Sequence, residues 1–245
     1  MRAGLIGLLL PCVAFAQPVA VPPAMQLHYE TYAAGIPVAQ VESGFRLGPR
    51  TYQMTLGYHT TGLVGFLFRG HQLDQVDGAW RGQLAAPSLF VGKGEWRGVN
   101  RLAEIAYRQG SPVIRALVPP NTDEREPVPE ALQAGSIDTL SALAELIHVV
   151  AETGRCETAV RTYDGRRAVE IEAHTVGEEM LEATSRSSFA GKALRCDFSG
   201  RMLSGFKFGD DRERDGRSMH GTAGQCTGRR GWRRWWPAGR RCRCG

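Results

Sequence analysis

Hydrophobic positions follow a helical period in one segment, Ser136–Gly154, and a strand period through most of the rest of the chain. In this segment apolar residues recur every three or four positions, so they form one face of a helix. That face comprises Leu140, Leu143, Ala144, Ile147, Val150 and Ala151, and the polar stripe opposite comprises Asp138, Ser141, Glu145, His148 and Glu152. Ser136 is suited to cap the helix and Gly154 to end it. We expect one amphipathic helix lying on the concave face of a curved sheet.

Alternation of apolar and polar residues predicts an antiparallel meander with one solvated face. The expected strands before the helix are Leu27–Tyr32, Val38–Leu47, Tyr52–His59, Leu73–Trp80, Leu89–Val91, Trp96–Tyr107 and Val113–Val118, followed by an irregular surface crossing, Pro119–Pro129. Those after it are Ala159–Tyr163, Arg166–Ala173, Leu194–Phe198 and Leu203–Phe208. Asp164-Gly165 predicts a two-residue hairpin turn, in which both residues need positive φ. The expected fold is mainly β: a curved antiparallel sheet or half-open β-barrel with one long helix packed on it.

The segment Thr60–Gly70 interrupts the alternation. It places five apolar residues within six positions, namely Leu63, Val64, Phe66, Leu67 and Phe68. One interpretation is a buried bend or short helix inside the core. The other is an apolar lip of a ligand cavity or a loop that touches a membrane. These five residues are the candidates for a ligand cavity.

The N-terminus has the features of a secretory signal peptide. Arg2 precedes an apolar run, and Ala14-Phe15-Ala16 resembles a cleavage site, so we expect cleavage after Ala16 and export to the periplasm. Cys12 suggests a lipidation site, but the preceding Pro11 fits one badly. Residues 17–24 form a proline-rich linker, and residues 25–215 form a single β-rich domain.

Cys156 and Cys196 are the two cysteines of residues 25–215. In an exported protein two such cysteines are expected to form a disulfide, which would close a loop of about 40 residues and stabilise the fold by roughly 3–4 kcal/mol. The alternative is a pair of buried free thiols. Neither cysteine has another Cys or a His at ligand spacing, so we expect no metal site.

Candidates for catalysis are weak. The sequence has no nucleophile-elbow, zinc-protease or phosphate-loop motif. His148 lies on the polar stripe of the helix, where a solvated or rim histidine is the simpler interpretation. Glu178, Glu179 and Glu182 could supply paired carboxylates, although a solvated strand edge explains them as well. Asp210–Asp215 is most simply a charged loop. We assign no catalytic residue and no cofactor.

Charge is concentrated in residues 216–245. The chain carries +5 overall, but this tail holds eight Arg and no acidic residue, and the other residues hold 22 basic and 25 acidic ones, a net of −3. The body therefore gives no reason to expect a nucleic-acid partner. The tail contains no Ile, Leu, Val or Phe, so we expect it to be disordered.

Two interpretations of the tail remain open. A genuine basic, aromatic tail would suit nucleic acid or an anionic membrane. The Arg/Gly/Trp/Cys bias is also what a GC-rich gene yields when read out of frame, since the closing Arg-Cys-Arg-Cys-Gly can shift to Pro-Val-Pro-Val-Arg. We favour a frameshift near Arg214–Gly221, to be decided by sequencing the gene.

Several segments resemble a known family. LHYETYAAGIPVA, TTGLVGFLFRG, GSIDTLSAL, YDGRR and SSFAGKALRC resemble the exported bacterial proteins called domain of unknown function 3108, over about Leu27 to Arg214. The resemblance implies a β-rich, curved-sheet or barrel-like envelope protein and no enzymatic activity. A kinship with lipoprotein-carrier half-barrels is an analogy at the level of fold.

Two function classes follow. The favoured one is a non-enzymatic periplasmic protein whose sheet and helix enclose an apolar cavity for a lipid or another hydrophobic envelope component, with at most peripheral association with the envelope. The alternative is a periplasmic hydrolase with an unrecognised site. An apolar cavity under Phe66 and Phe68 would favour binding, and convergent buried carboxylates or histidines would favour catalysis.

Overall fold

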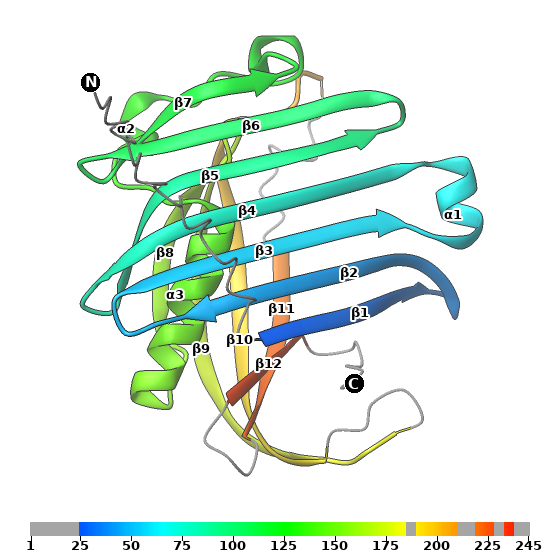
Figure 1. Cartoon of the computed structure of the whole chain (residues 1–245), viewed down its shortest axis with the longest axis vertical. Coiled ribbons are helices and arrows are strands. Elements are labelled where there is room, and N and C mark those ends of the chain that lie inside the picture. Colours follow the sequence, from blue (N-terminus) through cyan, green and yellow to red (C-terminus); the bar gives the residue numbers. More distant parts are fainter. Residues whose placement is uncertain (1–24, 185–189, 210–218, 228–232, 238–245) are drawn as a thin grey trace, which may run out of the picture.

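The larger layer of the protein is an antiparallel meander of seven strands in the order β1 to β7 (Figure 1). The structure is a computed structural model that describes residues 25–184, 190–209, 219–227 and 233–237. The strands are β1 (Met25–Ala33), β2 (Ile36–Leu47), β3 (Thr51–Thr60), β4 (Gly70–Arg81), β5 (Leu84–Trp96), β6 (Val99–Arg108) and β7 (Ser111–Val118). Successive side chains along a strand point to opposite faces of the sheet, and Phe45, Tyr52 and Met54 point to the concave face, where all three are buried.

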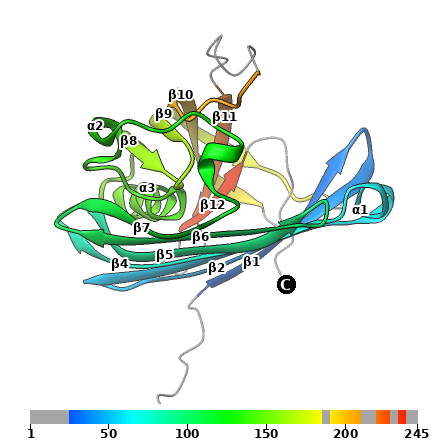
Figure 2. The ribbon, with the colours of Figure 1, turned by 90° about the horizontal axis from the view of Figure 1, so that it is seen from above.

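A smaller sheet and the long helix cover the concave face of this layer (Figure 2). The smaller sheet has the order β12-β11-β10-β9-β8. Its strands are β8 (Thr158–Tyr163), β9 (Ala168–Leu181), β10 (Gly191–Ser204), β11 (Met219–Thr227) and β12 (Arg233–Pro237). The helices are α1 (Gly62–Leu67), the 3-10 helix η1 (Asn121–Asp123), α2 (Glu130–Gln133) and α3 (Thr139–Thr153). The predicted fold class is confirmed, and the two sheets do not close into a barrel.

Helix α3 lies between the two layers and contacts β3, β4 and β5 on one side and β8 on the other. Its predicted end is confirmed: Gly154 adopts φ 71° and its N–H donates to the Val150 carbonyl. Its predicted start is wrong. The cap is Asp138, whose carboxylate accepts from the Ser141 N–H at 2.8 Å, whereas the Ser136 hydroxyl donates to the Gln133 carbonyl.

Three connections differ from the sequence prediction. We expected one strand over Trp96–Tyr107. A tight turn at Arg97-Gly98, with both residues at positive φ, instead ends β5 at Trp96 and lets β6 begin at Val99. The first strand expected after residue 193 lies within β10, which includes only Leu203 and Ser204 of the second, and the pairing of β10 with β9 continues through a register shift near Met202. The Asp164-Gly165 turn is a four-residue loop between β8 and β9, because the Asp164 side chain accepts from the N–H groups of Arg166 and Arg167.

The C-terminal tail contains two strands where we expected disorder. β11 pairs antiparallel with β10, and β12 pairs antiparallel with β11. Backbone pairing to the edge of a sheet requires no apolar side chain, so a segment that cannot build a core is still able to add strands. The frameshift hypothesis concerns the gene and stays a prediction. The expected signal peptide and linker, residues 1–24, and the charged segment Asp210–Asp215 lie outside the described residues.

Candidate ligand cavity

Three residues of the polar stripe of α3, Asp138, Ser141 and Glu145, are buried against the larger sheet, whereas Glu152 at its end is exposed. The Tyr52 hydroxyl donates to Ser141 Oγ at 2.8 Å, and Ser141 Oγ donates to Asp138 Oδ2 at 2.6 Å. One turn later, Glu145 Oε2 accepts from the Ala85 N–H at 2.7 Å. The stripe was expected on the opposite side from the core, and Asp138, Ser141 and Glu145 are instead core residues. Polar groups on β3 and β5, distant in sequence, satisfy them.

Burial controls the electrostatics of this contact. Desolvation raises the pKa of Asp138 to about 6. The hydrogen bonds from Ser141 favour the charged form and lower the pKa, but their effect is smaller than that of desolvation. Desolvation also raises the pKa of Glu145, against the hydrogen bond from the Ala85 N–H. The pKa of Tyr52 is raised for the same reason. These carboxyls are therefore buried anchors of the helix, with their acceptor atoms in use.

His148 completes the contact through its ring. It stacks on Trp80, with ring centroids 4.1 Å apart and planes 10° apart, and Trp80 lies 4.6 Å from the Tyr52 ring. The Trp80 indole N–H donates to the Gly48 carbonyl. His148 is half-buried against these rings. Stacking of this kind gives His148 a packing role in the structure.

The apolar side of α3 borders a cavity of about 510 Å³. Its walls come from β1, β2 and β3, from the helix, and from β8, β9 and β10. The strands of the larger sheet contribute Leu27, Tyr29, Thr31, Val41, Ser43, Phe45, Met54 and Leu56; α3 contributes Thr139, Leu140, Ala142, Leu143, Leu146 and Ile147; and the smaller sheet contributes Thr158, Val160, Ile171, Ala173 and Phe198. The volume lies within the range of about 300–1,000 Å³ that is common for small-molecule sites.

The cavity offers few polar groups. Among its polar members, Thr158 stands out because its Oγ1 is buried and has no hydrogen-bond partner. A buried hydroxyl without a partner is unusual, and a ligand with one polar atom would satisfy it. None of Tyr52, Asp138 and Glu145 lines the cavity, so the buried carboxyls of the helix contact do not face a molecule bound there. The arrangement suits binding of an apolar molecule more than acid–base chemistry.

The predicted cavity residues Leu63, Val64, Phe66, Leu67 and Phe68 lie elsewhere. They belong to the loop between β3 and β4, and α1 within it contains no buried residue. The short helix was one of the expected forms of this segment, but the prediction that it is buried in the core is wrong, because Phe66 is 85% exposed. A helix of six residues that packs mainly against β2 and β3 offers too little surface to cover its own apolar side chains. The apolar cavity therefore exists, but not under Phe66 and Phe68.

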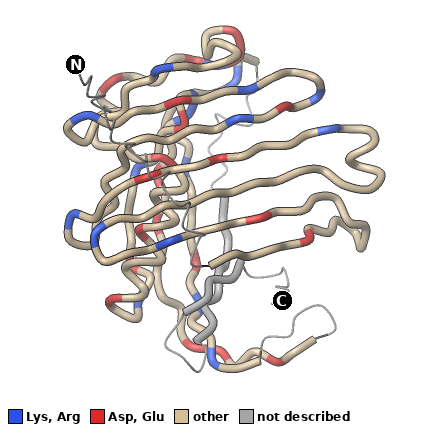
Figure 3. The backbone as a smooth tube through the Cα atoms, viewed as in Figure 1, with Lys and Arg blue, Asp and Glu red and all other residues tan. Residues whose placement is uncertain are grey.

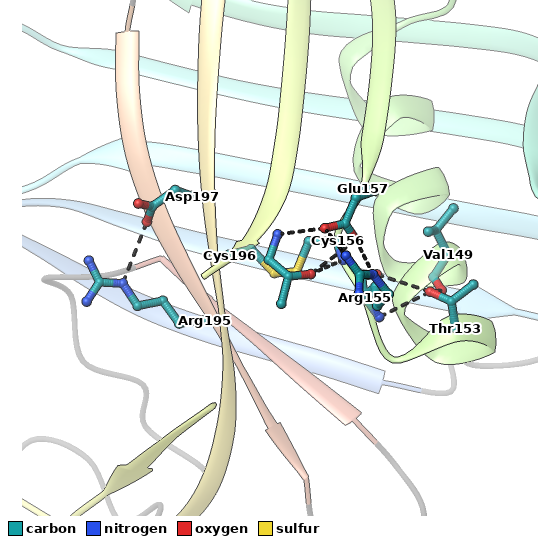
Figure 4. The surroundings of a disulfide bond; sticks show 9 residues. Val149, Thr153, Arg155, Cys156, Glu157, Arg195, Cys196 and Asp197 are labelled. Carbon is teal, nitrogen blue, oxygen red and sulfur yellow. Dashed lines mark hydrogen bonds and ion pairs between the residues drawn. A yellow bond between two sulfur atoms is a disulfide. The ribbon is translucent and has the colours of Figure 1, made fainter. Parts of the chain in front are cut away.

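The predicted disulfide between Cys156 and Cys196 is confirmed, with 5.9 Å between the Cα atoms (Figure 4). Both residues are fully buried. The bond joins the segment just after α3 to β10, so it links the end of the helix to one wall of the cavity. Next to it, Arg155 forms an ion pair with Glu157, and the Cys156 N–H donates to Thr175 Oγ1.

The other acidic candidates are paired across strands. Glu178 forms an ion pair with Lys192, and Glu179 forms one with Arg195. Glu182 is exposed. These contacts stabilise the pairing of β9 with β10 and do not bring two carboxylates together. Within the described residues, no three His, Cys, Asp or Glu side chains gather at metal-binding distances.

Comparison with known proteins decides the family. The model of a family described as a protein of unknown function, DUF3108, matches residues 26–204. This chain belongs to the DUF3108 family. The match covers the larger sheet, α3 and strands β8, β9 and β10 of the smaller sheet, so the cavity is built entirely from the DUF3108 region. No curated protein and no solved structure matches the chain.

In the described part of this DUF3108 protein, none of the helices has both the length and the hydrophobicity needed to cross a bilayer.

Proposed function

We propose that this protein is a non-enzymatic periplasmic binding protein that holds a lipid or another hydrophobic envelope component in the cavity beside α3. The observation that carries the proposal is the cavity itself: about 510 Å³, bordered by both sheets and α3 and lined almost throughout by apolar side chains. Apolar ligands are stabilised by removal of their surface from water, which such a lining supplies.

Two further features support the proposal. The partnerless Thr158 hydroxyl in the wall would fix the orientation of a ligand that has a polar end. The buried disulfide is consistent with an oxidising compartment, which agrees with the expected export through a signal peptide cleaved after Ala16.

The test uses a variant that fills the cavity. Leu146 lies on α3, lines the cavity and is half-buried. Leu146→Trp should therefore occupy ligand space without replacing a tightly packed side chain. We expect the wild-type protein to bind a monomeric fluorescent fatty acid, and Leu146→Trp to lower the affinity by about tenfold or more.

The matched control is Leu84→Trp. Leu84 is 62% exposed and does not line the cavity, so this variant carries the same change of residue outside the site. We expect it to bind like the wild type. If the wild type does not bind the probe, or if both variants bind it equally while folded, the proposed function is wrong.

A further inference from the structure

One end of the larger sheet carries a cluster of exposed apolar side chains. We call this end the apolar tip and define it by three connections: residues 32–36 between β1 and β2, residues 61–69 between β3 and β4, and residues 96–99 between β5 and β6. Its exposed large hydrophobic side chains are Tyr32, Ile36, Leu63, Phe66, Leu67, Phe68, Trp96 and Val99. Single exposed apolar residues are ordinary, but a cluster from three adjacent connections indicates a contact surface.

Backbone contacts hold the three connections together. The Thr61 N–H donates to the Val38 carbonyl, which joins the α1 loop to the start of β2. The Arg97 N–H donates to the Arg69 carbonyl, which joins the same loop to the β5–β6 turn. The loop residues therefore have fixed positions at the end of the sheet, and Figure 2 shows α1 at the outer edge of the larger sheet, away from the helix layer.

The charge of the apolar tip has one sign. Its three connections contain two charged residues, Arg69 and Arg97, and no acidic residue. The Arg97 guanidinium lies over the Phe68 ring, 4.6 Å from its centroid, and 5.9 Å from that of Trp96. Figure 3 shows the α1 loop without charge along most of its length. Arginine above aromatic rings is suited to the boundary between lipid headgroups and acyl chains.

We propose that the apolar tip docks on the surface of an anionic phospholipid bilayer. Phe66, Leu67 and Leu63 would enter the interface, and Arg69 and Arg97 would contact lipid phosphates. The choice of a bilayer rests on this pairing of protruding apolar side chains with arginines and no acid. This inference goes beyond ligand binding in the cavity, because the tip and the cavity share no residue.

The apolar tip lies close to the cavity along β1 and β2. Thr31 and Val41, on β1 and β2, line the cavity, and the tip begins at Tyr32, the residue directly after Thr31. A protein docked through the tip therefore brings that end of the cavity close to the lipid surface.

The test is co-sedimentation of the full chain with vesicles, comparing phosphatidylglycerol-containing with pure phosphatidylcholine vesicles. Phe66→Ser removes the most exposed side chain of the tip, and Leu84→Ser removes a similar apolar side chain from the opposite end of the sheet. We expect about tenfold weaker binding to anionic vesicles for Phe66→Ser and no change for Leu84→Ser. The basic C-terminal tail is the same in all three proteins, so its contribution cancels in the comparison.

Hydrogen exchange locates the contact. Anionic vesicles should slow exchange in peptides covering residues 61–70 and leave peptides covering residues 81–84 unchanged. Arg97→Gln should weaken binding to anionic vesicles and leave the weaker binding to phosphatidylcholine unchanged. Equal vesicle binding by the wild type and Phe66→Ser, unchanged exchange at residues 61–70, or a dimer of the wild type that Phe66→Ser abolishes would overturn the proposal. The fatty-acid assay in solution is independent of these outcomes, so failure of docking is distinguishable from failure of the cavity to bind.

Discussion

The two sides of α3 meet the rest of the protein in opposite ways. On the side of the larger sheet, Ser141 and Glu145 are hydrogen-bonded to β3 and β5, and His148 stacks on Trp80. On the other side, Leu143 and Leu146 pack partly against the core and border the cavity. The polar stripe thus fixes the helix in place. The apolar side of the helix contributes to the core and also borders space that a ligand can fill.

The largest effect is expected from breaking the covalent link between the cavity wall and the helix. Replacing both Cys156 and Cys196 by Ser should lower the free energy of unfolding by about 3–4 kcal/mol, because the disulfide closes a long loop in the unfolded chain. Urea denaturation of the two proteins measures the difference. An unchanged midpoint would mean that the non-covalent attachment of α3 alone holds the wall.

A pH titration tests the buried side. The pKa of Asp138 is raised to about 6 in the folded protein, above its unfolded value of 3.8. A raised pKa means that stability is full below pH 4 and falls as pH rises through about 6, by up to about 3 kcal/mol from this group. The raised pKa of Glu145 adds in the same direction. Thermal unfolding from pH 4 to pH 7 should show this slope, and Asp138→Asn should flatten it.

Removing the cap of α3 tests the same contact by substitution. Asp138→Ala leaves the Ser141 N–H and hydroxyl without their acceptor, and we expect a loss of about 2 kcal/mol at pH 7. Asp138→Asn keeps an acceptor for the Ser141 N–H and should cost less than half as much. Denaturation curves that rank the two variants equally would show that the cap contributes little to the attachment.

The smallest effect is expected where the helix faces the cavity. Val150 is fully buried and does not line the cavity, so Val150→Ala should cost about 2 kcal/mol. Leu146→Ala removes more atoms but only enlarges existing space, and we expect it to cost about 1 kcal/mol. Chemical denaturation measures both. A larger loss for Leu146→Ala would mean that the side chain packs tightly and that the cavity is filled in solution.

Local patterns in the sequence were sufficient for much of the fold. Alternation of apolar and polar residues predicted the meander, the helical period predicted α3, and two cysteines in a chain expected to be exported predicted the disulfide. Each of these depends on neighbours in sequence or on the cellular compartment. The short helix within Thr60–Gly70 could also be predicted, because its run of apolar residues interrupts the alternation that is typical of a strand.

The candidate site was less accessible because it depends on long-range contacts. The polar stripe of α3 is compatible with water or with a matching polar surface, and only the positions of Tyr52 and Ala85 decide between them. Core-facing residues such as Phe45 and Leu143 were identifiable, but the gap between them is set by the separation of the two layers. The apolar composition of Leu63–Phe68 suggested a cavity lip, whereas its place at the end of the sheet leaves it exposed.

The central claim is that the apolar side of α3 borders a ligand site. Native mass spectrometry of the full chain, purified from the cell envelope without detergent, tests it most directly. We predict that the wild-type protein and Leu84→Trp carry an added mass corresponding to a lipid or another apolar envelope molecule, and that folded Leu146→Trp does not. Wild-type protein that appears only at its bare mass, or an adduct that Leu146→Trp retains in full, would contradict the account.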